Sequence, residues 1–193
     1  MISLEQPREG KVLLHCCCAP CAGALLEAMV EQDIRPTVFF SNSNIVPFEE
    51  YELRKAELIR YCTSLGLEVV DDDYDHPAWL DCVLHKGSGR EQELASMPER
   101  MERCSECFRF RLSRAAAYAS QNGYSCLATT LATSRWKDLE QVNSALERAC
   151  AEVEGVAPWT GNWRKGGLQP RRSEIIREQN FYNQTFCGCE FSL

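Results

Sequence analysis

Short apolar runs alternate along this chain with longer stretches in which apolar residues recur at the 3.6-residue period of a helix. This alternation restricts the possible folds more than any other feature of the sequence. Predicted strands occupy residues 11–15, 36–41, 67–70 and 125–130. Predicted helices occupy residues 20–32, 48–65, 101–121, 137–151 and 174–180. Strands separated by helices of about ten residues or more form βαβ units. The sequence therefore predicts an α/β protein with a parallel sheet and flanking helices.

The length of the chain, 193 residues, suits one domain with its own hydrophobic core. No repeat, low-complexity segment or linker divides the sequence, so we expect a single α/β domain over residues 1–193. The stretch from about 76 to 122 is predicted to be a helical insertion. Residues 181–193 are predicted to form a C-terminal tail.

Cysteine is unusually frequent, with twelve residues in the chain. Disulfide frameworks are typical of short secreted proteins. The first twelve residues here include acidic side chains and no apolar run, so we expect no signal peptide. No stretch approaches the roughly 18 apolar residues that span a bilayer. We expect a cytoplasmic protein without a membrane segment, in which clustered cysteines indicate metal or redox chemistry.

The densest cysteine cluster is HCCCAPC at residues 15–21, where the first strand is expected to meet the first helix. Sites in parallel α/β sheets lie at the carboxyl ends of the strands. Free backbone N–H groups and the positive end of a helix lower a thiol pKa there and favour the metal-binding thiolate. A core role fits any one of these cysteines but explains four together poorly.

A second cluster is Cys104-Ser105-Glu106-Cys107, near the start of a predicted helix. A C-x-x-C pair alone serves zinc, redox and iron–sulfur sites alike. Combined with the first cluster it indicates a four-thiolate site, for which zinc and an iron–sulfur cluster both stay open. Structural zinc typically uses two C-x-x-C knuckles, which adjacent cysteines at a strand end match poorly.

The third element is Cys187-Gly188-Cys189 in the tail. Two thiols separated by one glycine can close a small, strained disulfide that is easily reduced. Such a pair suits a mobile two-electron reductant; a structural pair or a third metal knuckle is the alternative. The four isolated cysteines are expected to be inert core residues: Cys62, Cys82, Cys126 and Cys150.

Other chemistry is weakly indicated. The histidines His15, His76 and His85 show no paired metal spacing. Neither a phosphate-binding P-loop nor a G-x-G-x-x-G dinucleotide motif is present. With a net charge of −7, the protein as a whole does not attract a polyanion. Binding of a nucleic acid would therefore need a local patch of basic residues.

With these motifs in place, the chain resembles the QueH type of epoxyqueuosine reductase. The matching segments are HCCCAP at 15–20, SNSNIVPFEEYELR at 41–54, CSECFR at 104–109 followed by Leu112, ATTLATS at 128–134 and FYNQTFCGCEFS at 181–192. They cover nearly everything from residue 11 onward, in the same order. The resemblance implies a fold like the adenine-nucleotide α-hydrolase (HUP) group. It also implies removal of the epoxide oxygen of epoxyqueuosine at the tRNA wobble position, which gives queuosine.

The resemblance carries site residues onto this chain. It implies four ligands of a 4Fe–4S cluster: Cys17, Cys18, Cys104 and Cys107. It implies Cys187 and Cys189 as the catalytic, redox-active pair. The family varies after Ala-Pro, where this chain has Cys21, so a fifth thiolate and an additional iron beside the cluster stay open.

The implied partners are the tRNA anticodon stem–loop bearing epoxyqueuosine and an unidentified electron donor. We expect the basic residues of the C-terminal third to contact phosphates: Arg164, Lys165, Arg171, Arg172 and Arg177. Trp159 and Trp163, in a predicted long loop at 155–167, are candidate stacking surfaces. Candidate proton donors are Tyr182, Asp75 and Glu190.

Two alternatives stay open at this stage. One is an iron–sulfur thiol oxidoreductase that acts on another small electrophile. The other is a zinc-stabilised binding domain without catalytic activity.

Overall fold

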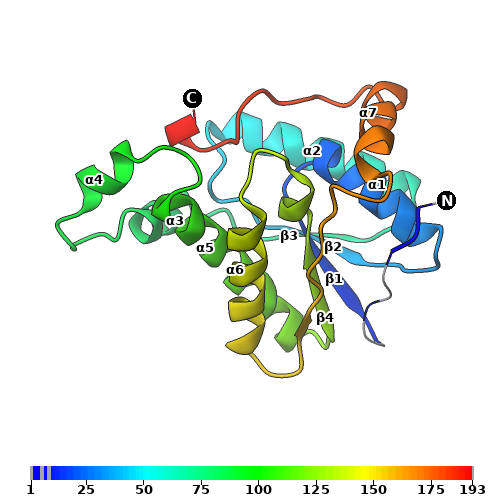
Figure 1. The fold of residues 1–193 in the computed structure, drawn as a ribbon, viewed down its shortest axis with the longest axis horizontal. Helices are drawn as coiled ribbons and strands as arrows, with labels where there is room; N and C mark the ends of the chain where they lie inside the picture. The colour runs from blue at the N-terminus through cyan, green and yellow to red at the C-terminus, as the bar shows by residue number, and fades with distance from the viewer. Residues whose placement is uncertain (1, 5–6, 8–9, 193) are drawn as a thin grey trace.

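A computed structural model of the chain describes residues 2–4, 7 and 10–192. Its centre is a parallel sheet with the strand order β3-β2-β1-β4-β5 (Figure 1). The strands are β1 (Val12–Cys16), β2 (Thr37–Phe40), β3 (Val69–Asp71), β4 (Cys126–Thr129) and β5 (Ala157–Pro158). The predicted α/β class with a parallel sheet is confirmed, and the arrangement is compatible with a HUP-like fold.

Helices cover both faces of this sheet. They are α1 (Ala19–Val30), α2 (Phe48–Ser64), α3 (His76–Val83), α4 (Glu91–Ser96), α5 (Glu102–Gln121), α6 (Leu139–Ala151) and α7 (Leu168–Glu178). Two short 3-10 helices are η1 (Thr130–Thr133) and η2 (Glu190–Ser192). Helices α1, α2 and α7 pack together on one face, and α5 and α6 pack on the other (Figure 1). The connection from β1 to β2 passes through α1 on one face, and the connection from β4 to β5 passes through α6 on the other, which produces this two-faced packing.

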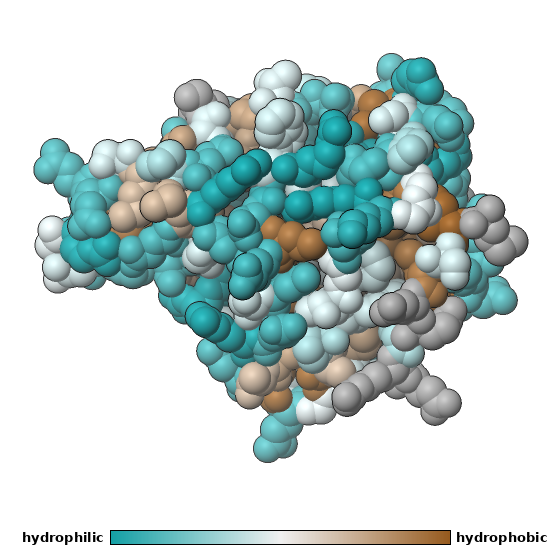
Figure 2. Space-filling model, in the orientation of Figure 1, coloured by the Kyte–Doolittle hydropathy of each residue, from teal (hydrophilic) through white to brown (hydrophobic). Residues whose placement is uncertain are grey.

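The central strand β1 is buried along its whole length, and so is β4 beside it. A strand covered by helices on both faces must be apolar throughout, which explains the run Val12–Cys16 rather than an alternating pattern. On the face viewed in Figure 2, hydrophilic residues dominate and hydrophobic residues appear only in small separate areas. The large apolar side chains are therefore mostly inside, around β1.

The region predicted as a helical insertion contains α3, α4 and α5. Helix α4 lies far from the sheet, whereas α5 runs back to contact β1, β4 and α6 (Figure 1). The alanines Ala115, Ala116 and Ala119 bury the second half of α5 in the main core. Among the described residues, no helix is both long and apolar enough to cross a bilayer.

The prediction for residues 155–180 was wrong in two respects. The expected loop contains the short strand β5, which pairs with β4 and carries the following residues over the core. Trp159 and Trp163 are consequently buried and pack edge to face, with ring centroids 5.3 Å apart. They cannot serve as stacking surfaces for RNA.

The last helix also begins at Leu168 rather than at Glu174. Gly167, with a φ of 92°, forms the turn into this helix, and Pro170 is tolerated in its first turn, where no backbone N–H is needed.

Candidate active site

The candidate site lies where the connections from two neighbouring strands diverge. From β1 the chain continues into α1 on one face, and from β4 it continues into η1 and α6 on the other. Open α/β sheets bind ligands at such a switch point, outside the carboxyl ends of the strands. Cys17 and Cys18 directly follow β1, and Thr130 directly follows β4. The Thr130 hydroxyl accepts a 3.2 Å hydrogen bond from the Cys17 N–H and lies 3.6 Å from the Cys17 sulfur.

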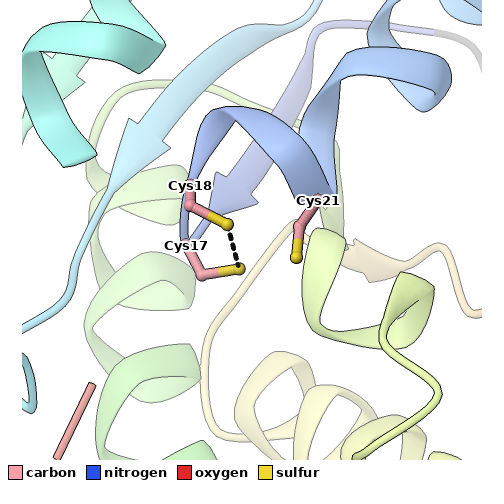
Figure 3. Close-up of side chains that lie close together, drawn as sticks. All are labelled: Cys17, Cys18 and Cys21. Carbon is pink, nitrogen blue, oxygen red and sulfur yellow. Dashed lines mark hydrogen bonds between the residues drawn. The ribbon is translucent and has the colours of Figure 1, made fainter. Parts of the chain in front are cut away.

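Three cysteines of the first cluster form a close group at this point. The sulfur atoms of Cys17, Cys18 and Cys21 all lie within 4.8 Å of one another, and those of Cys17 and Cys18 are 3.8 Å apart. Figure 3 shows the three side chains pointing toward one another at the start of α1. Sulfurs on one tetrahedral zinc, with Zn–S bonds of about 2.3 Å, are separated by about 3.8 Å. The group therefore has the spacing of metal ligands.

The thiols of this group are not equivalent. Hydrogen bonds from the Cys18 and Cys21 thiols lower the pKa of Cys17 well below its ordinary value, although burial opposes this shift. The hydrogen bond to Cys17 raises the pKa of Cys18 well above its ordinary value and that of Cys21 to about 11. These shifts favour the thiolate form at Cys17 and the thiol form at its two neighbours.

The three predicted cysteine clusters surround one cavity of roughly 480 Å³. Six cysteines line it: Cys17, Cys21, Cys104, Cys107, Cys187 and Cys189. Cys18 does not line the cavity, but its sulfur accepts a 2.7 Å hydrogen bond from the Gln184 amide. Cys104 and Cys107 lie outside the close group of three sulfurs. Within the described part of the chain, no disulfide joins any of the twelve cysteines.

Two buried or partly buried cations face these thiols, and sequence reasoning missed both. The Lys137 ammonium lies 3.6 Å from the Cys187 sulfur. Burial would lower the pKa of Lys137, but the electrostatic effect of the nearby cysteine sulfurs, that of Cys187 most and then those of Cys17 and Cys21, raises this pKa above its ordinary value. Arg111 is buried, donates to the Ser41 carbonyl at 3.2 Å and also bonds the Asn42 side chain.

A sequence signal existed for each cation. Arg111 follows Cys107 by four residues and Cys104 by seven, which places all three on one face of a helix. Lys137 follows the carboxyl end of β4, the edge where parallel sheets place their sites.

The tail is held against the cavity rather than extended into solvent. Arg54 donates to the Cys187 carbonyl at 3.0 Å, and Val46 N–H donates to the Gly188 carbonyl at 2.9 Å. Gly188 has a φ of 120°, and a Cβ there would lie 3.1 Å from both Arg54 and Ile45. Cys189 packs in a small apolar cluster, where burial raises its pKa to about 11.

His15 fixes the floor of the site without titrating near neutral pH. Its ring is buried, with Nε2 3.1 Å from the Ser41 carbonyl and Nδ1 2.8 Å from the Thr129 hydroxyl. A carbonyl only accepts, so Nε2 carries the hydrogen and donates it to Ser41. Burial, with a smaller effect from Arg111, lowers the pKa of His15 to about 3. The neutral ring thus ties the ends of β1, β4 and the β2 connection together.

The candidate proton donors lie elsewhere. The Tyr182 hydroxyl donates to Glu50, Asp75 caps α3 by accepting from Ala78 N–H, and Glu190 pairs with His76. None of the three candidates lines the cavity as far as the described residues define it.

The basic residues expected to contact phosphates divide into different roles. Arg171 is fully engaged by Glu27, Glu174 and Glu178, so it joins α7 to α1. Arg164 donates to the Lys137 carbonyl at 2.9 Å. Of the five, Arg172 lines the cavity.

The isolated cysteines also differ from one another. Cys62, Cys126 and Cys150 are buried, as expected for core residues. Cys82 is half-buried and accepts a 3.0 Å hydrogen bond from Arg109, so its expected core position was wrong.

A parallel α/β sheet with a thiol-lined cavity at its switch point defines a class of α/β protein whose cysteine cluster could hold a metal ion. Comparison with known proteins is more specific. The family model described as "Epoxyqueuosine reductase QueH" matches residues 12–193. The chain therefore belongs to the epoxyqueuosine reductase QueH family, which makes it an oxidoreductase.

Curated relatives with that name span most of the chain. A protein of Histophilus somni is 43% identical over 191 residues, which are 98% of this chain and 75% of the relative. A protein of Acinetobacter baylyi is 40% identical over 100% of this chain and 85% of its own length. A protein of Thermotoga maritima is 30% identical over 95% of this chain and 91% of its own length.

Proposed function

We propose that this protein reduces epoxyqueuosine in the anticodon loop of a tRNA to queuosine, with an iron–sulfur cluster and the Cys187/Cys189 dithiol in one cavity. The observation that carries this proposal is the meeting of six cysteines from the β1 end, α5 and the tail around a single space. The reaction is inferred from family membership, and its location is inferred from the cavity.

The donor set fits an iron–sulfur cluster. Thiolates are the ligands of such clusters. Three of the four proposed ligands line the cavity, Cys17 after β1 and Cys104 and Cys107 on α5, and the sulfur of the fourth, Cys18, lies 3.8 Å from that of Cys17. Arg111 and Lys137 would offset the negative charge of several thiolates in a partly dry space. Burial raises the pKa of the Cys107 thiol, and the indole N–H of Trp79, which also lines the cavity, opposes that shift by hydrogen bonding to the thiol, so it would suit a thiolate ligand there. Cys21 adds a fifth thiol, with which an additional iron could bind beside the cluster.

Bound at this site, an iron–sulfur cluster supplies electron transfer and a Lewis acid for oxygen. The dithiol of Cys187 and Cys189 supplies the two electrons. Both C–O bonds of the epoxide break, an alkene forms, the two thiol protons leave with the oxygen as water, and the sulfurs join as a disulfide. An external electron donor then reduces that disulfide again. The Lys137 ammonium, 3.6 Å from the Cys187 sulfur, would stabilise negative charge that develops on that sulfur during the reaction.

An anaerobic assay tests this function directly. Cluster-loaded protein is incubated with epoxyqueuosine-containing tRNA and a reductant, and the nucleosides are quantified by mass spectrometry. We expect queuosine to form with the wild-type protein, and Cys187→Ser to retain its iron but lose turnover. Cys82→Ser, which changes a half-buried cysteine outside the cavity, is the matched control and should stay active. Fully iron-loaded wild-type protein that leaves epoxyqueuosine unchanged would refute the proposal.

A further inference from the structure

The mouth of the thiol-lined cavity carries one conspicuous aromatic side chain. Trp136 is 75% exposed, whereas the other tryptophans of the chain, Trp79, Trp159 and Trp163, are 1%, 7% and 6% exposed. Trp136 lines the cavity together with Cys17 and Cys187. A large indole left in solvent contributes little to the fold, because it buries little apolar area.

The backbone that carries Trp136 is held in place. The Arg100 guanidinium donates to the carbonyls of Trp136 and Arg135, at 2.8 Å and 3.4 Å. Gln141 in turn donates to the Arg100 carbonyl at 2.7 Å, and Arg164 donates to the next carbonyl, that of Lys137, at 2.9 Å. The exposed ring therefore projects from a segment that two arginines fix, so little ordering is needed when a ligand binds it.

Two arginines that line the same cavity as Trp136 have guanidinium groups available to a ligand. Arg135 is exposed and Arg172 is half-buried, and both line the cavity. Within the residues that the structure describes, neither side chain has a hydrogen-bond or ion-pair partner, in contrast to Arg171. Of the two carboxylates at the same mouth, Asp138 is engaged in capping α6 and Glu99 is exposed. The mouth thus combines an exposed aromatic ring, on a backbone segment held by hydrogen bonds, with two arginines whose side chains have no partner among the described residues, in a protein whose net charge is −7.

We propose that Trp136 stacks on an unpaired base of an RNA loop while Arg135 and Arg172 bind its flanking phosphates. Aromatic faces with neighbouring cations are the usual means of holding single-stranded nucleotides. The inference rests on the proposed function: the modified base enters the cavity, so an adjacent nucleotide must lie at its mouth.

Because Trp136 is the exposed tryptophan, its fluorescence can report whether RNA covers its ring. Cluster-loaded protein is titrated with an unmodified anticodon stem–loop RNA, and with a blunt RNA duplex of equal length as the comparison ligand. We expect the stem–loop to shield the exposed tryptophan from acrylamide quenching, and the duplex to leave it accessible. Trp136→Ala should weaken stem–loop binding by about five- to a hundredfold, and Trp136→Phe, which keeps a ring, by less than about threefold.

The charges are tested separately through the salt dependence of binding. Arg135→Ala and Arg172→Ala should each flatten the plot of log affinity against log salt by about one unit. The matched control is Arg148→Ala, which removes an exposed arginine on α6 outside the cavity and should leave the slope unchanged.

The outcomes separate this inference from the proposed function. If Trp136→Ala binds the stem–loop as tightly as the wild type while queuosine still forms, the stacking role is wrong and the function stands. Equal weakening for stem–loop and duplex also overturns stacking. If the wild type neither binds the stem–loop nor converts epoxyqueuosine in tRNA, both proposals fail. A near-ultraviolet circular dichroism spectrum of each variant confirms that it is folded.

Discussion

The ammonium nitrogen of Lys137 lies 3.6 Å from the sulfur of Cys187, although 50 residues separate the two in sequence. The contact joins the segment after β4 to the tail. It places a positive charge beside one of the two thiols proposed to deliver electrons.

Replacing Lys137 should therefore impair the dithiol without removing the metal site. We expect Lys137→Met to slow alkylation of Cys187 by iodoacetamide at neutral pH and to lower turnover by about tenfold or more, because hydrogen bonds to charged groups contribute about 1.5–3 kcal/mol. Lys137→Arg, which keeps the charge, should recover part of both. Peptide mapping of the alkylated protein measures the first effect. Unchanged alkylation of Cys187 in Lys137→Met would show that the ammonium does not act on this thiol.

The tail depends on a backbone conformation that favours glycine. Gly188→Ala would place a methyl group 3.1 Å from Arg54 and Ile45 at a φ of 120°, so we expect the Cys187/Cys189 pair to be displaced. Iron content should remain at the wild-type level while turnover falls by about tenfold or more. Gly123→Ala is the control, since Gly123 also has a positive φ, 71°, but no atom within 4 Å of the added group. Equal turnover in both variants would contradict a positional role for the tail.

His15 predicts a pH dependence of stability. Its pKa is about 3 in the folded protein and about 6.5 when unfolded, so between these values the unfolded chain binds more protons. Stability from His15 is complete above about pH 6.5 and is lost as the pH falls, by at most about 1.4 kcal/mol per unit. Urea unfolding from pH 8 to pH 5 measures this slope. His15→Gln should be less stable at pH 8 but show a shallower slope; parallel curves would exclude His15 as the source.

Arg171 should matter for stability and not for RNA. Its guanidinium bonds Glu27 on α1 at 2.6 Å and also Glu174 and Glu178, while its side chain stays 26% exposed. Partly exposed ion pairs contribute little, so Arg171→Ala should lower the free energy of unfolding by about 1 kcal/mol. Stem–loop affinity should equal that of the wild type, in contrast to Arg172→Ala. A loss of affinity in Arg171→Ala at unchanged stability would restore the role first expected for this residue.

Much of the fold could be predicted from periodicity, because buried parallel strands and amphipathic helices leave clear patterns. The segment at 155–167 could not, since its glycines and Pro158 indicate a loop while pairing of β5 with β4 decides that Trp159 and Trp163 are buried. The spacing of residues in the sequence does not show that this segment pairs with a strand distant in the chain.

The candidate site shows the same division. The cysteines of the three clusters were identifiable because their spacing is local and the strand-end rule brings the first cluster to the sheet edge. Their roles stay predictions. Lys137, Arg111 and Trp136 are ordinary residues in the sequence, and their importance depends on the packing of α5 and of the segment after β4 around the cavity.

The proposed function depends most on an iron–sulfur cluster that is shared between the cysteines after β1 and those on α5. Iron and acid-labile sulfide should be quantified in anaerobically reconstituted wild-type protein, in Cys104→Ser and in Cys187→Ser, with Cys82→Ser as the control. We predict about four sulfides and at least about four irons per chain in the wild type, Cys187→Ser and Cys82→Ser, and a severe loss of both in Cys104→Ser. An intact cluster in Cys104→Ser, or a wild-type protein that takes up one zinc and no sulfide, would contradict it.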